Sequence, residues 1–205
     1  MTSAIFLFIA GLNSFKNSFK FSQTNNSSRK TFFKGIIISI FPITLAMSII
    51  DVIINRVYNL FVLSPMNYDM IYSSFRDTGM WNTNNTGFVW TQANNVSSLL
   101  GTIIWLFAVY SVFFLIGIFI SLIYYRSNKL LKVIISVILI MLLMLSYNIY
   151  RLLPVSFWIA MGKWISFAFG WQSRNPYMAV ASFTVIGIIC AGFIYLLIRK
   201  AVAKE

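Results

Sequence analysis

The sequence predicts an all-α, polytopic membrane protein, and three observations carry this prediction. Hydrophobic residues make up 59% of the 205-residue chain and charged residues only 10%, which is far from the composition of a soluble domain. The mean hydropathy is +0.81. The apolar residues are gathered into long runs, and a helix needs about 20 such residues to cross roughly 30 Å of hydrocarbon. Lipid is therefore expected to be the main solvent of this chain.

The apolar runs divide the chain into predicted segments. Four runs are long enough to be full transmembrane helices: 35–54, 99–125, 133–150 and 178–198. The first run, 1–13, is too short to span and lacks both a basic start and a small-residue cleavage site, so we expect a partial helix rather than a signal peptide. The polar stretch 55–98 is expected to be an outer loop, with a lid or partner-contact role as one option.

The run 152–171 is apolar enough to cross, but we predict a re-entrant or interfacial pair of short helices in the outer leaflet. Pro154, Gly162 and Gly170 punctuate the run, and these residues often interrupt helices. Its tryptophans favour the membrane interface. A full crossing here would also send the C-terminal cations to the side opposite the other basic clusters.

Charge is sparse and one-sided, with 16 Lys and Arg residues against 4 Asp and Glu residues. Eleven of these cations fall on one side of the predicted helices: Lys16, Lys20, Arg29, Lys30, Lys34, Arg126, Lys129, Lys132, Arg199, Lys200 and Lys204. The positive-inside rule places that side, with the C-terminus, in the cytoplasm of a multi-pass plasma-membrane protein. No basic face with interleaved aromatics is present, so the expected partner is the lipid bilayer and not nucleic acid.

The residue inventory argues against an enzyme. The chain has no histidine, which excludes His-dependent nucleophilic mechanisms and His-ligated metals. Glu205 is the sole glutamate, and no phosphate loop or dinucleotide fingerprint is present. We expect no catalytic, cofactor-binding or metal-binding residues in this chain, so any energy it uses comes from a partner or a gradient.

Three polar residues within the predicted helices are candidate pathway or interface groups. Asp51 is the one acidic residue in a predicted crossing, and an intramembrane carboxylate suggests function. It lies five residues from Arg56, so an interfacial ion pair or a snorkelling group competes with an ion or proton site. Tyr147 and Asn148 either line a path or hydrogen-bond a neighbouring helix.

The segment 14–34 is predicted to be a cytoplasmic amphipathic element. Phe15 and Phe19 are four residues apart, as are Lys16 and Lys20, so a helix would place two aromatics on one stripe and two cations beside it. Ser27 or Ser28 could cap the helix that follows.

The run SFKNSFKFSQTNNSSRKTFFKG, with its Ser-Arg-Lys followed by an aromatic pair, resembles the cytoplasmic connection between the second and third helices of bacterial ABC-2-type permeases. The layout is similar too, since those permeases have a short re-entrant pair before their last crossing. The resemblance covers about 20 residues as a motif. Nothing before Met1 corresponds to the first helix of that family, so we expect a shortened or fragmentary version.

The resemblance implies a permease subunit that works with a separate ATP-binding subunit and with a second permease subunit, as a homodimer or heterodimer. ATP and Mg would be bound by the partner, and the exported substrate would be a peptide, lipid-linked molecule or antimicrobial. The implied ATPase-coupling surface consists of Phe15, Lys16, Phe19, Lys20, Arg29 and Lys30. Two alternatives stay open: a non-transporting membrane interaction protein (immunity, sensor-associated or assembly factor), and a gradient-driven carrier.

Overall fold

The computed structural model describes residues 2–62, 64–73, 75, 92–134, 136–138, 141, 145, 154–199 and 201. Within these residues all regular secondary structure is helical. The named helices are α1 (Thr2–Thr24), α2 (Arg29–Tyr58), α3 (Asn67–Tyr72), α5 (Val96–Arg126), α7 (Val155–Ala168) and α8 (Pro176–Arg199). The all-α prediction is confirmed for this part of the chain.

Three helices, α2, α5 and α8, are long and apolar enough to cross a membrane. They contain the predicted crossings 35–54, 99–125 and 178–198 and extend beyond each of them. The chain is therefore a multi-pass membrane protein by length and composition. Most of the fourth predicted crossing, 133–150, lies outside the described residues.

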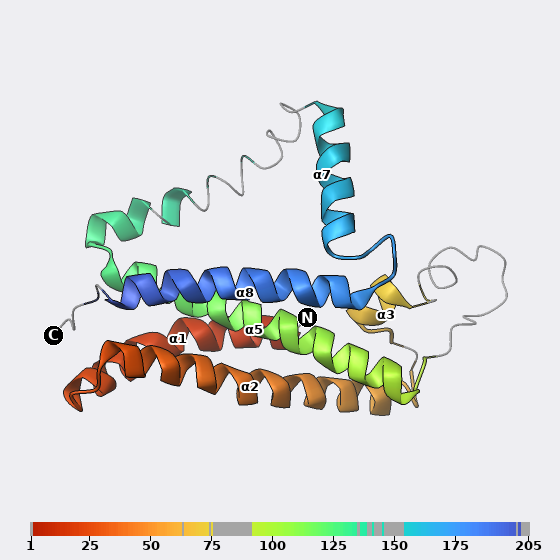
Figure 1. Cartoon of the computed structure of the whole chain (residues 1–205), viewed down its shortest axis with the longest axis horizontal. Coiled ribbons are helices and arrows are strands. Elements are labelled where there is room, and N and C mark those ends of the chain that lie inside the picture. The colour runs from red at the N-terminus through yellow and green to blue at the C-terminus, as the bar shows by residue number, and fades with distance from the viewer. Residues whose placement is uncertain are drawn as a thin grey trace.

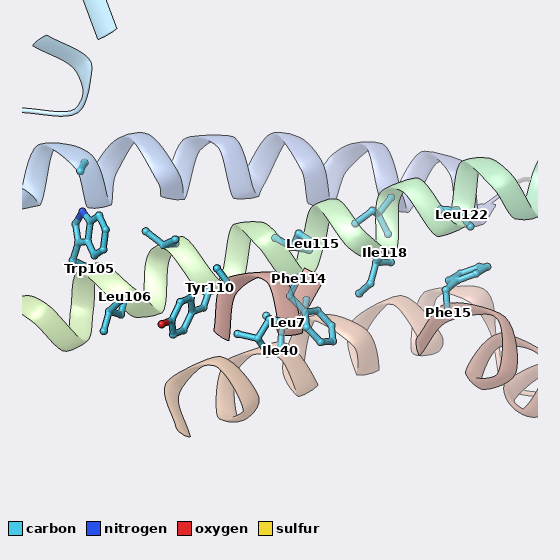
Figure 2. Close-up of a cluster of buried hydrophobic side chains, with 14 of the residues drawn as sticks. Leu7, Phe15, Ile40, Trp105, Leu106, Tyr110, Phe114, Leu115, Ile118 and Leu122 are labelled. Atoms are coloured by element: carbon cyan, nitrogen blue, oxygen red, sulfur yellow. The ribbon is translucent and has the colours of Figure 1, made fainter. Parts of the chain in front are cut away.

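The bundle is built around α5, which packs against α1, α8 and α2 (Figure 1). Figure 2 shows buried side chains spaced along the length of α5, with Leu7, Phe15 and Ile40 approaching from α1 and α2. In the most apolar 18-residue stretch of α5, 56% of the residues are buried inside the protein, whereas in that of α8 only 11% are. Thus α5 is the central helix and α8 presents most of its surface outward.

Helices α1 and α5 approach each other closely where Gly11 faces Gly117. A Cβ atom on Gly117 would lie only 3.1 Å from the Cα of Gly11 and would overlap the carbonyl oxygen of Phe8. Small residues allow helix backbones to approach closely in membranes, where packing rather than hydrophobicity drives association. The two glycines therefore fix the distance between α1 and α5.

The N-terminal part of the fold differs from the predicted division into a partial helix 1–13 and a separate segment 14–34. α1 continues without a break to Thr24, and a short turn containing Asn26 at φ 53° leads to α2. Ser28 caps α2 by accepting a hydrogen bond from the Thr31 backbone N–H at 3.1 Å, as the sequence predicted. The segment is thus a tight hairpin made of the end of α1 and the start of α2.

The opposite end of the bundle carries α3 and α7. The Tyr72 hydroxyl of α3 donates to the Phe169 carbonyl, at 2.8 Å, in the turn between α7 and α8. α7 runs crosswise to the long helices, joins α8 through this turn and has no buried residue (Figure 1). Over 152–171 a pair of short helices was predicted, and the structure corrects this. The described residues of this run form a single helix, α7, which continues through Gly162. A turn with Gly170 at φ 63° follows it.

The predicted outer loop 55–98 is shorter than expected. α2 extends to Tyr58, α5 begins at Val96, and the helix α3 lies between them. Residues 76–91 of this loop lie outside the described part of the chain.

Candidate functional site

The α1–α2 hairpin brings the predicted coupling cations to one end of the bundle. Lys16 and Lys20 are exposed on α1, and Arg29 and Lys30 are exposed at the start of α2. The Arg29 Nη1 donates to the Arg199 carbonyl at 2.6 Å, which ties the start of α2 to the end of α8. We call this end, where α1 ends, α2 begins, and α5 and α8 end, the basic end.

The two aromatic residues of the predicted coupling surface are buried in the structure. Phe15 and Phe19 are 1% and 0% exposed, so neither ring can form a surface for a partner in this conformation. They stack on each other at a centroid distance of 5.3 Å, and both also contact Phe32 and Tyr125. These four residues, the aromatic cluster, join α1, α2 and α5 immediately beneath the exposed cations.

The basic end is electrostatically one-sided. It holds the exposed cations Lys16, Lys20, Arg29, Lys30, Lys34, Arg126, Lys129, Lys132 and Arg199. The described residues include two carboxylates, Asp51 and Asp69, and both lie toward the other end of α2. The described part of the basic end therefore has no internal counter-charge, and an anionic partner or surface is attracted to it.

Asp51 sits where α1, α2 and α5 meet. Its carboxylate accepts one hydrogen bond from the Ser3 hydroxyl at 2.8 Å and another from the Tyr110 hydroxyl. Of the alternatives that the sequence left open for Asp51, the ion pair with Arg56 is not formed in the described structure. Asp51 also lines a cavity of about 200 Å³ together with Asn55, Asn67 and Tyr110, among other residues. A carboxylate whose described donors are neutral, beside a polar cavity, can attract a cationic group.

A second polar cluster, which the sequence analysis missed, lies at the end of the bundle opposite the basic end. Asp69 is 4% exposed and accepts hydrogen bonds from the Met66 N–H and from Gln92 Nε2, both at 3.1 Å. Gln92 also donates to Asn55 Oδ1 at 2.8 Å. Burial raises the pKa of Asp69, against the opposing effects of the Met66 hydrogen bond and the positive charge of Arg56. Gln92 lies 23 residues from Asp69 and 37 from Asn55 in the sequence, so no local pattern signalled this cluster.

Arg56 contributes to this second cluster through charge. All three guanidinium nitrogens are shielded from solvent and make no hydrogen bond. The guanidinium therefore interacts with Asp69 by electrostatic attraction. Burial also raises the pKa values of the neighbouring Tyr68 and Tyr72 hydroxyls, which stay neutral donors at physiological pH.

Two other predictions concern Tyr147 and Asn148 and the absence of a metal site. Tyr147 and Asn148 lie outside the described residues. Within the described part of the chain, no group of three or more potential ligands is arranged to hold a metal ion.

Comparison of the chain with protein-family models, with curated proteins and with solved structures finds no match. A functional assignment must therefore rest on the two features described above. One is the basic end with its aromatic cluster, and the other is the Asp51 cavity.

Proposed function

We propose that this chain is the membrane-spanning permease subunit of an ATP-driven ABC-type transporter in a bacterial plasma membrane. In this proposal the basic end and the C-terminus face the cytoplasm, where positive charge is retained. ATP and Mg are bound by a separate ATP-binding subunit, and a second permease subunit completes the pathway. The transported substrate is a peptide, lipid-linked molecule or antimicrobial.

The observation that carries the proposal is the attachment of an exposed cationic hairpin to the central helix through the aromatic cluster. Lys16 and Lys20 can engage acidic groups of a partner while Phe15 and Phe19, one residue before each, anchor the same helix turn on Tyr125 of α5. A well-packed core transmits displacement because it has little free volume to absorb it. Force applied to the hairpin is therefore passed to α5.

The same helix reaches the intramembrane carboxylate. Tyr110, which donates to Asp51, is 15 residues before Tyr125 on α5. At 1.5 Å per residue this separation is about 22 Å along the helix axis. Movement of α5 driven from the basic end would change the hydrogen bond and the shape of the Asp51 cavity, so Asp51 is the pathway group we favour.

In this proposal exposed cations, and not the buried rings, contact the ATP-binding subunit. The rings of Phe15 and Phe19 act as anchors, and the contact surface comprises Lys16, Lys20, Arg29 and Lys30.

The test is a mild-detergent purification of the tagged chain from its native membrane, with mass spectrometry of the copurifying proteins. We expect a stoichiometric ABC-type ATP-binding subunit with the unmodified chain and its loss from the Lys16→Glu/Lys20→Glu variant. The matched control is Lys129→Glu/Lys132→Glu, which reverses the same number of exposed charges at the same end. Absence of the subunit from a folded, unmodified preparation would leave a membrane interaction protein as the better assignment.

A further inference from the structure

A groove between α5 and α8 at the basic end is not used by the proposed transport mechanism. Its volume is about 550 Å³, and its walls combine apolar side chains with two arginines: Phe119, Ile123, Phe193, Leu196, Arg126 and Arg199. All of these residues belong to two helices that are long and apolar enough to cross the membrane. The groove therefore lies between two helices that we expect to cross the bilayer, at their basic end.

The walls of the groove suit a hydrocarbon chain. Phe193 and Leu196 are 53% and 56% exposed, so α8 leaves them uncovered on its outward face. Phe119 of α5 contacts Phe193 across the groove, with ring centroids 6.0 Å apart. A flexible acyl chain can lie against these side chains and bury apolar surface without requiring any hydrogen bond.

The end of the groove suits an anionic group. Arg126 and Arg199 stand in the last turns of α5 and α8, and both are exposed. Neither guanidinium has a described hydrogen-bond or ion-pair partner, and the carboxylates Asp51 and Asp69 lie toward the other end of the bundle. Guanidinium groups bind phosphate oxygens in a fixed, two-pronged geometry.

We infer that this groove is a binding site for an anionic phospholipid, with the phosphate between Arg126 and Arg199 and an acyl chain along Phe119, Phe193 and Leu196. Basic pockets between spanning helices on the positively charged side recognise such head groups. A phospholipid fits better than an acidic protein segment, because the two arginines continue directly into an apolar groove between two helices long enough to cross the bilayer. The inference is independent of the proposed transport function.

The test measures binding of two lipids to the full chain in neutral detergent by native mass spectrometry. Dioleoylphosphatidylglycerol carries a net negative charge. Dioleoylphosphatidylcholine has the same acyl chains but no net charge. Each basic residue near an anionic head group contributes on the order of a five-fold preference, so two arginines predict about 30-fold tighter binding of the anionic lipid. The Arg126→Gln/Arg199→Gln variant should lose this preference.

The matched control is Lys129→Gln/Lys132→Gln, which removes two exposed charges close to the groove but outside its lining. It should retain most of the preference. Equal binding of the two lipids to the unmodified chain, or an equal loss in both double variants, would overturn the site in favour of diffuse charge attraction. Glycerol 3-phosphate, which carries the phosphate without acyl chains, should not displace the lipid at equal concentration; displacement would refute a role for the apolar groove.

A second variant tests the groove without changing charge. Leu196→Trp should fill the groove and weaken binding of both lipids, whereas Ile188→Trp, on the same helix at a position 66% exposed and outside the groove, should not. All variants must keep the gel-filtration profile and helical circular dichroism of the unmodified chain. Unchanged binding to a correctly folded Leu196→Trp variant would contradict the inference.

Discussion

The aromatic cluster allows a stringent stability test with two phenylalanines of one helix. Phe19 is 0% exposed, whereas Phe21, two residues further along α1, is 73% exposed. Phe19 contacts three other rings at centroid distances of 5.3, 5.3 and 5.8 Å. Truncating a buried phenylalanine to alanine typically costs about 3 to 5 kcal/mol through lost contacts and the cavity left behind.

We expect Phe19→Ala to lower the free energy of unfolding by about 3 kcal/mol. For a chain of this size each kcal/mol corresponds to roughly 2 to 4 °C in Tm, so the expected loss is about 6 to 12 °C. Phe21→Ala, at an exposed position, should change the stability by less than about 0.5 kcal/mol. Thermal unfolding in a mild detergent, followed by circular dichroism, measures both variants side by side.

The two phenylalanines have the same side chain, the same helix and nearly the same depth, so burial is the main variable between them. Equal Tm shifts, or a Phe19→Ala variant as stable as the unmodified chain, would refute the aromatic cluster as the joint between α1, α2 and α5. The same result would remove the physical basis for transmitting force from the hairpin to α5.

Two further predictions concern α5. Gly117→Ala should lower Tm, because the added methyl overlaps the α1 backbone and such overpacking costs about 1 to 3 kcal/mol. Gly192→Ala on α8, whose added Cβ would meet nothing within 4 Å, should instead leave Tm unchanged or raise it, since alanine is the better helix former. Tm changes of the same sign in the two variants would contradict the close approach of α1 and α5. Tyr110→Phe should cost about 1 to 3 kcal/mol by leaving the Asp51 carboxylate with Ser3 as its described donor. Combining it with Asp51→Leu should recover part of that loss in the same thermal assay, and a purely additive further loss would argue against the Asp51–Tyr110 contact.

The sequence was informative where a property depends on neighbouring residues. The three spanning helices follow from run length, and a serine cap at Ser27 or Ser28, which the structure places at Ser28, follows from the position before an apolar segment. The helical stripe of Phe15 and Phe19 was also predicted from their spacing. Spacing does not say what covers a stripe, and Tyr125 comes from a helix more than 100 residues away in the sequence.

Three differences between the structure and what sequence spacing suggested have physical reasons. Asp51 and Arg56 are five residues apart, which places them about 140° apart around a helix of 3.6 residues per turn, so they cannot pair as residues three or four apart do. Gly162 did not divide α7, because an interior glycine costs only about 1 kcal/mol and the helix tolerates it. Asn13 and Ser14 did not end α1, since packing against α5 outweighs the moderate helix propensity of polar residues.

The two long helices that line the Asp51 cavity differ in a way that favours relative movement. α5 runs without interruption from Val96 to Arg126, and its contacts to α1 and α2 include Tyr110, Gly117 and Tyr125. α2 contains Pro42 between its start at the basic end and Asp51. Proline removes one backbone hydrogen bond and is the usual place where a helix bends. A displacement of the hairpin is therefore expected to move α5 as one unit while α2 bends at Pro42, so the two sides of the cavity shift relative to each other at the Asp51–Tyr110 contact.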